Sequence, residues 1–178
     1  MSFFAKIKNW YFIIVLGVVV LMYYNLTRRM DYFEERLDKA DGTISLAMYE
    51  SIEHWSDSFD IPKHIAYNVA YQETRYQGPF DFDYNPRQVS TAGAVGPMQI
   101  IPIYAHKYAG RRVSSKELMT NIDLNVKVSM HMLRTWYEIY RDWTLACGAY
   151  NTGQPVRNGY AVYATSNREY KNRWVKIQ

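Results

Sequence analysis

The first 42 residues combine one apolar run with a charged segment. The run Trp10–Tyr24 contains fifteen residues without a charged side chain, and aromatic residues stand at both of its ends. At 1.5 Å per residue a helix of this length spans about 22 Å, somewhat less than the apolar core of a bilayer. We therefore predict a transmembrane signal anchor over residues 10–26, with residues 1–9 in the cytoplasm and a charged stalk over residues 27–42.

A cleaved signal peptide is the alternative for this segment, since the run is short and two lysines precede it. No small-residue cleavage pattern follows Tyr24, which favours an anchor that stays in the protein. The two lysines are matched by Arg28 and Arg29 after the run, so the orientation rests on the extra positive charge of the amino terminus. We expect a single-pass protein of the inner membrane with its main domain in the periplasm, or of a virion membrane if a phage encodes it.

From Thr43 onward the apolar positions recur at intervals of three and four, which is typical of amphipathic helices. The predicted helices cover Ile44–Phe59, a segment from Pro62 to about Arg75, Asn121–Tyr140, Trp143–Tyr150 and Asn167–Lys176. Turn residues dominate Tyr76–Ser90, and Gly93–Pro102 is predicted to be a loop that leads into a helix or a turn. No alternating strand pattern is longer than a few residues. We therefore predict a mainly α fold with one globular domain over residues 43–178.

Charge divides the chain and suggests a class of partner. Residues 31–60 carry nine acidic and two basic side chains, a net charge of −7. Residues 61–178 carry fifteen basic and eight acidic side chains, a net charge of +7. The main domain is therefore basic and suits an anionic partner. Nucleic acid is one such partner, although the chain has no Gly-rich phosphate loop, zinc finger or RNA-binding motif, and a polyanionic cell wall fits as well. Together with the motifs described below, this leads us to expect the cell wall and no nucleic acid.

The composition also limits the chemistry. The one cysteine, Cys147, cannot form a disulfide within the chain, and its apolar surroundings in the sequence indicate a buried packing residue. The four histidines are too scattered for a zinc site, so we expect no metal and no other cofactor. Aromatic residues make up 16% of the chain, and flat rings of this kind suit a carbohydrate groove.

Three short segments carry the candidate chemistry. They are Glu73-Thr74-Arg75-Tyr76, Gly93-Ala94-Val95-Gly96-Pro97-Met98-Gln99 and Ala149-Tyr150-Asn151-Thr152-Gly153. In this order they resemble the catalytic core of the soluble lytic transglycosylase family, which is related in fold to goose-type lysozyme. The resemblance runs from about Ile44 to Lys176. It implies a lysozyme-like transglycosylase domain, preceded here by one transmembrane helix.

The resemblance implies that Glu73 is the catalytic acid and base, acting on the glycan strands of peptidoglycan. Its apolar neighbours Val69 and Ala70 indicate a pocket that raises the pKa of the carboxyl. Attack by the 6-hydroxyl of muramic acid would then cleave the MurNAc–GlcNAc β-1,4 bond without water and form a 1,6-anhydro sugar. The substrate-binding residues implied are Thr74, Gly96, Met98, Gln99, Tyr150, Asn151 and Tyr170, the last as a late tyrosine that closes over the carboxyl.

The chain departs from the family pattern at three places. Thr74 replaces the usual serine, Pro97 replaces the usual leucine, and residues 77–84 form an insertion that contains Asp81 and Asp83. We expect this insertion to be a groove-edge loop with aromatic sugar contacts. If either aspartate activated a water molecule, the enzyme would be a hydrolytic muramidase. A non-catalytic wall-binding or assembly factor is the other alternative.

A small domain on a membrane anchor, without added wall-binding modules, suits local opening of the wall. The partners that we expect are the glycan strands and, through residues 10–26, the lipid bilayer. A machine for phage infection, secretion or pilus assembly is the further partner that this arrangement indicates.

Overall fold

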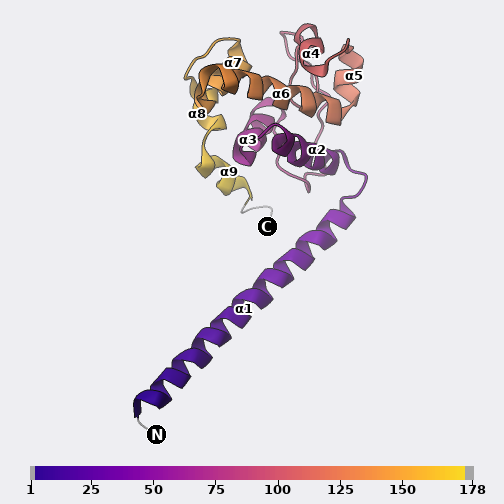
Figure 1. Cartoon of the computed structure of the whole chain (residues 1–178). Coiled ribbons are helices and arrows are strands. Elements are labelled where there is room, and N and C mark those ends of the chain that lie inside the picture. Colours follow the sequence, from indigo (N-terminus) through magenta and orange to yellow (C-terminus); the bar gives the residue numbers. More distant parts are fainter. Residues whose placement is uncertain (1–2, 175–178) are drawn as a thin grey trace. The chain divides into compact units, whose positions relative to one another are not determined.

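The computed structural model describes the backbone of residues 3–174 and the side chains of residues 10–171 (Figure 1). Its first unit is a single helix, α1 (Phe3–Lys39), which runs without a break through the predicted anchor and most of the predicted stalk. The apolar side chains from Trp10 to Leu26 are exposed, and the helix is long and apolar enough to cross a membrane. A signal sequence near the amino terminus meets the same criteria of length and apolar character, so the anchor stays a prediction.

The second unit begins at Ala40 and contains the other helices of the described chain. They are α2 (Ile44–Ser58), α3 (Lys63–Thr74), α4 (Pro102–Ala109), α5 (Ser115–Thr120), α6 (Ile122–Tyr140), α7 (Trp143–Thr152), α8 (Gly159–Ala164) and α9 (Asn167–Trp174). Between residues 3 and 174 the β structure consists of isolated bridges that join Val95 to Val89 and to Ile100. The prediction of a mainly α fold is confirmed. The predicted end of the last helix, Lys176, lies outside the described residues.

Helix α6 packs against α2, α4, α5 and α7, and α7 in turn contacts α8. The buried core that these helices share includes Met48 and Ile52 of α2, Ile65 and Val69 of α3, Val126, Met130 and Leu133 of α6, and Cys147 of α7. Val126, Met130 and Leu133 of α6 are spaced four and three residues apart, the spacing that predicts this helix from the sequence. Burial of these side chains supplies the main favourable contribution to the folding of this unit.

Polar side chains at the helix ends fix where several elements begin. The residues whose side chains accept a backbone N–H from the first turn are Thr43 for α2, Ser114 for α5, Asn121 for α6, Asp142 for α7 and Asn158 for α8. Each satisfies a donor that the helix itself leaves without a partner. Helix α3 ends at a left-handed residue, Arg75, whose φ is 63° and whose N–H donates to the Tyr71 carbonyl. Glu73 therefore lies in the last turn of α3.

Candidate active site

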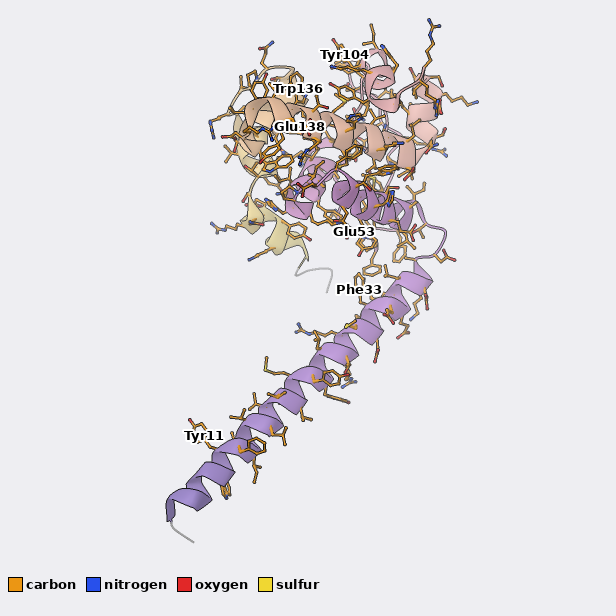
Figure 2. The ribbon with its side chains drawn as sticks, in the orientation of Figure 1. Tyr11, Phe33, Glu53, Tyr104, Trp136 and Glu138 are labelled. Atoms are coloured by element: carbon orange, nitrogen blue, oxygen red, sulfur yellow. The ribbon has the colours of Figure 1, made fainter. Side chains whose placement is uncertain are left out.

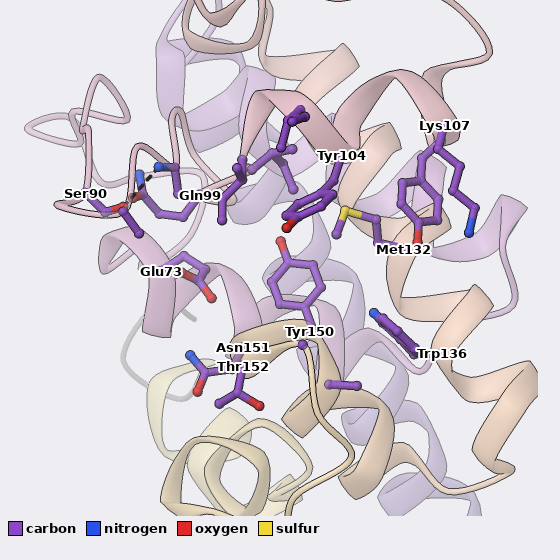
Figure 3. A pocket seen from close by; sticks show the side chains of 18 of the residues that line it. Glu73, Ser90, Gln99, Tyr104, Lys107, Met132, Trp136, Tyr150, Asn151 and Thr152 are labelled. Atoms are coloured by element: carbon purple, nitrogen blue, oxygen red, sulfur yellow. Dashed lines mark hydrogen bonds between the residues drawn. The ribbon is translucent and has the colours of Figure 1, made fainter.

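Glu73 lines a cavity of about 740 Å³ in the second unit (Figure 3). The walls come from the end of α3, the loop that follows Ser90, and helices α4, α6 and α7. Gln99, Tyr150 and Asn151 also line this cavity. Among the described residues of its wall, Glu73 is the only aspartate or glutamate. The cavity has the size of a typical ligand site.

Burial and one hydrogen bond act in opposite directions on the pKa of the Glu73 carboxyl. Burial raises its pKa to about 7, because the charged form loses hydration. The hydroxyl of Tyr160 donates a hydrogen bond of 2.5 Å to Oε1, which favours the charged form and lowers the pKa. Burial has the larger effect, so a substantial fraction of the carboxyl is protonated near neutral pH. The raised pKa that the apolar neighbours predict is confirmed.

Helix α3 holds Tyr160 at two points. Gln72 Nε2 donates to the carbonyl oxygen of Tyr160 at 2.8 Å, while Glu73 accepts from the phenol hydroxyl. One turn earlier the fully buried Asn68 donates to three carbonyl oxygens at the end of α8 and just after it. Polar residues along one side of α3 therefore place α8 against the carboxyl.

The Gly-rich segment is a tight loop that Asn125 of α6 holds in place. Asn125 Nδ2 donates to the carbonyl oxygens of Val95 at 3.0 Å and Leu118 at 2.9 Å. Its Oδ1 accepts from the N–H of Met98 at 3.0 Å. At Gly96 φ is +77°, and a Cβ would lie 2.5 Å from both the Leu118 oxygen and Asn125 Nδ2. This position therefore requires glycine.

Thr74 lies behind this loop and is not part of the described cavity wall. Its side chain is buried, and Oγ1 donates to the Pro97 carbonyl oxygen at 2.8 Å. Thr74 Oγ1 also forms a hydrogen bond with the hydroxyl of Tyr84, at 2.7 Å. Tyr84 belongs to the insertion and is itself buried. The insertion thus supports the Gly-rich loop through Thr74.

The rest of the insertion packs beside the start of α2. Ser45 Oγ donates to the Pro79 carbonyl oxygen at 3.0 Å, and the Tyr76 hydroxyl donates to the Ser45 carbonyl oxygen at 2.8 Å. None of residues 77–84, all of which the structure describes, belongs to the wall of the Glu73 cavity. This differs from the expected groove-edge loop. The physical reason is that the loop buries Pro79 and Tyr84 and bonds to Ser45 of α2 and Thr74 of α3.

The motif Ala149–Gly153 supports the Gly-rich loop and also adds a polar side chain to the cavity. The Tyr150 hydroxyl donates to the Met98 carbonyl oxygen at 2.6 Å and pairs with Ser129 Oγ at 2.9 Å. Asn151 is exposed at the cavity, and its Oδ1 accepts from Asn158 Nδ2 at 3.2 Å. Tyr150 therefore ties α7 to the Gly-rich loop, while Asn151 presents an amide to the cavity.

The residues predicted for the site fall into two groups in the structure. The first group lines the cavity and consists of Glu73, Gln99, Tyr150 and Asn151. The second group is buried in or beside the Gly-rich loop and consists of Thr74, Gly96 and Met98. Tyr170 of α9 lies against Tyr67, with ring centroids 5.9 Å apart, and is not part of the described cavity wall. The tyrosine that donates to the Glu73 carboxyl is Tyr160, which the motif comparison does not single out.

The described site offers one titrating carboxyl beside amides and aromatic rings. Among the side chains that the structure describes, no three His, Cys, Asp or Glu residues gather as a metal site would require. The expected lack of a metal or other cofactor stays a prediction. The Glu73 carboxyl can donate one proton and accept one in return, and the amides and aromatic rings beside it can bind a sugar.

Comparison with known proteins agrees with this geometry. The family model described as "Transglycosylase SLT domain" matches residues 50–172, a range that contains all three motifs and Tyr160. A search of curated proteins finds no match. The matched range covers more than half of the chain, and it lies within the helical unit that contains Glu73. The chain therefore belongs to the transglycosylase SLT family, whose domain is that of transglycosylases acting on peptidoglycan.

Proposed function

We propose that the protein is a lytic transglycosylase that cleaves the MurNAc–GlcNAc β-1,4 bond of peptidoglycan and leaves a 1,6-anhydro-MurNAc end. One observation carries this proposal. Glu73 is the only carboxyl residue in the described cavity wall, and burial raises its pKa to about 7. A reaction that uses one group first as acid and then as base needs no more than this. Hydrolysis with inversion would need a second carboxylate to activate water.

In the proposed reaction the protonated Glu73 donates its proton to the glycosidic oxygen that links C1 of MurNAc to the GlcNAc residue. The C1–O bond breaks, GlcNAc leaves with a hydroxyl group, and positive charge develops at C1. The Glu73 carboxylate then accepts the proton of the MurNAc 6-hydroxyl, whose oxygen bonds to C1. The carboxyl is protonated again at the end, and no water is consumed.

The other site residues divide between contact and support. We assign Gln99, Tyr150 and Asn151 to the substrate, since they share the cavity with Glu73. Thr74, Gly96 and Met98 support the loop from which Gln99 projects, and we assign them an indirect role in substrate binding. Tyr160 is the residue that we add to the site, because its hydroxyl contacts the carboxyl directly.

Replacement of Glu73 by glutamine tests the assignment. Glu73→Gln keeps the shape of the side chain but removes the titrating proton, so we expect release of anhydromuropeptides to fall at least about a hundredfold. The measurement is mass spectrometry of peptidoglycan digested with the full chain in detergent. Glu50→Gln, an exposed acid of α2 outside the cavity, is the matched control and should keep full activity.

The products of the same digest distinguish a lytic transglycosylase from a hydrolytic muramidase. Anhydro ends support the intramolecular mechanism, whereas reducing ends would identify a hydrolytic muramidase. Retention of more than about a tenth of the activity in Glu73→Gln would contradict the role of Glu73. Binding to the wall without any cleavage by the unaltered chain would point to a non-catalytic wall-binding factor.

We further propose that α1 anchors the enzyme in the inner membrane, with the amino terminus inside and the catalytic unit in the periplasm. The length and apolar character of the helix support this placement. A domain tethered in this way acts on wall close to its own membrane. We therefore propose that it opens the wall locally for a phage infection, secretion or pilus apparatus.

A further inference from the structure

The Glu73 cavity has a second end, formed by helices α4 and α6. Tyr104 and Lys107 of α4 and Met132 and Trp136 of α6 line it, and we call these four residues the α4–α6 subsite. Figure 3 shows Lys107, Met132 and Trp136 on one side of the view and Glu73 on the other, with Tyr104 and Tyr150 between them. Tyr104 and Trp136 also lie on the same side of the second unit in Figure 2. In this view Glu73 and three residues of the α4–α6 subsite therefore lie on opposite sides of the cavity.

The α4–α6 subsite carries the opposite charge to the acid. Lys107 is the only lysine or arginine among the described residues of the cavity wall, and its side chain is exposed. No ion pair is formed by Lys107 with a described carboxylate. Its Nζ lies 5.3 Å from the ring centroid of Tyr108, which helps to hold the ammonium group at the wall. The cation is thus available to an anionic ligand.

Aromatic rings at this end suit a sugar next to the cation. Tyr104 is 57% exposed, so most of its ring is open to a ligand. The Trp136 indole stacks on Tyr140, with centroids 5.9 Å apart and an interplanar angle of 12°, which fixes its orientation. Flat rings of this kind can pack against the apolar face of a sugar while the ammonium group binds a charged substituent.

In a peptidoglycan strand the sugar rings are neutral, and the negative charge lies on one substituent. This is the lactyl ether of muramic acid, which ends either in a free carboxylate or in an amide-linked peptide with carboxylates of its own. We infer that the α4–α6 subsite binds a carboxylate on this lactyl arm and thereby selects strands that contain muramic acid. The inference rests on the proposed function, since it takes peptidoglycan as the ligand.

Binding measurements on the full chain in detergent test the inference. The Glu73→Gln background prevents cleavage during titration. The ligands are a GlcNAc–MurNAc tetrasaccharide with peptide stems, the same sugar with its stems removed to leave lactyl carboxylates, and chitotetraose, which has no carboxylate. Lys107→Met keeps the aliphatic stem of the side chain and removes the charge. Lys116→Met, an exposed cation of α5 outside the cavity, is the matched control.

We expect Lys107→Met to weaken binding of the carboxylate ligands about three- to fivefold, the size of a solvent-accessible ion pair, and to leave chitotetraose unaffected. The difference should shrink in about 0.5 M salt. A loss confined to the stem-bearing ligand assigns the carboxylate to the stem, and a loss confined to the stem-free ligand assigns it to the lactyl group. A loss with both ligands shows that Lys107 binds either carboxylate. Equal weakening of all three ligands, or of none, overturns the inference.

The outcome is separable from that of the proposed function. Binding is measured without cleavage, so a chain that prefers carboxylate ligands through Lys107 but forms no anhydro product contradicts only the proposed reaction. A chain that forms the product and binds equally well with Lys107 or methionine contradicts only the α4–α6 subsite.

Discussion

At the scale of the residue, the pKa of the Glu73 carboxyl depends on its burial and on one hydrogen bond. Burial raises its pKa to about 7, and the Tyr160 hydroxyl opposes this by stabilising the ionised form. A general acid must be protonated, so kcat/KM should fall as the pH rises above about 7. The limb at alkaline pH therefore reports the pKa of Glu73 in the free enzyme.

Replacement of Tyr160 by phenylalanine should move this limb to higher pH. Loss of the hydroxyl removes a hydrogen bond that only the ionised carboxyl gains from, so the ionised form becomes less stable and the pKa of Glu73 rises further. We expect a shift of about one to two pH units, since a hydrogen bond to a charged group contributes about 1.5–3 kcal/mol. The measurement is the pH dependence of kcat/KM for release of anhydromuropeptides.

The control is Tyr137→Phe on α6, which removes a phenol hydroxyl outside the cavity and keeps the ring that stacks on Trp143. Its pH profile should match that of the unaltered chain. The Tyr160 ring itself should stay in place, because Gln72 holds the backbone of that residue. An unchanged or acid-shifted limb in Tyr160→Phe would show that the hydroxyl does not act on the Glu73 carboxyl.

The sequence predicts Glu73 and its raised pKa but not Tyr160. The glutamate stands in a recognisable motif after two apolar residues of the same helix, so its burial can be expected from local spacing. Tyr160 comes from α8, 87 residues later in the chain, and reaches the carboxyl only because α3 binds α8. Nothing in the local sequence separates it from the other tyrosines. Tertiary packing alone makes it part of the site.

At the scale of the element, the hydroxyl of Thr74 joins the end of α3 to the Gly-rich loop and the insertion. Thr74→Val has nearly the same shape but leaves the Pro97 carbonyl and the Tyr84 hydroxyl buried without this partner. We expect a loss of about 2–6 kcal/mol in the free energy of unfolding, since each of the two unsatisfied buried groups costs about 1–3 kcal/mol. Denaturant unfolding of the full chain measures it.

Thr74→Ser is the matched control, because it keeps the hydroxyl and loses only a methyl group. Its cost should be about 1 kcal/mol. The activity of Thr74→Val should fall as well, since the loop carries Gln99 into the cavity. If valine and serine destabilised the chain equally, the hydroxyl would not be the link between these elements.

The aspartates of the insertion test the mechanism at the same scale. Neither Asp81 nor Asp83 belongs to the described cavity wall, so Asp81→Asn combined with Asp83→Asn should change the rate only a few-fold, through the positioning of the loop. The anhydro product should remain the main one. Product analysis by mass spectrometry, with the unaltered chain digested in parallel, gives the answer. A loss of about a hundredfold, together with reducing ends from the unaltered chain, would support the hydrolytic alternative.

The elements differ in how far the sequence predicts them. Helices α2, α3, α6 and α7 follow from apolar spacing, because each is long enough to bury a continuous stripe. Helices α5 and α8 have six residues each, too few for a period to show. The start of α5 does carry a local signal, since Ser114 and Glu117 have the spacing of a capping box and the serine hydroxyl accepts from the Glu117 N–H. The inward packing of the insertion has no such signal.

At the scale of the whole molecule, helix α1 exposes a large apolar surface. From Trp10 to Leu26 the large apolar side chains of α1 are each at least 50% exposed. Exposure of this much apolar surface to water is unfavourable. The exposure is avoided if lipid covers the segment or if the segment is cleaved off. The catalytic unit, by contrast, buries its apolar residues in a core of its own. Membrane insertion and cleavage are therefore the two outcomes to separate.

We predict that the segment from Trp10 to Tyr24 stays in the mature protein as an anchor. The residues around its C-terminal end, Tyr23-Tyr24-Asn25-Leu26, lack the small side chains that a signal peptidase selects. Protein extracted from membranes should therefore have an intact mass that includes the sequence before Trp10. Val18→Arg places a charge near the centre of the apolar run, costs about 2.5–3.5 kcal/mol of insertion free energy, and should release part of the protein from the membrane fraction, whereas Val18→Leu should not. Recovery of a soluble form that begins near Asn25 would show instead that the run is a cleaved signal, and the catalytic unit would then act on the wall without a tether.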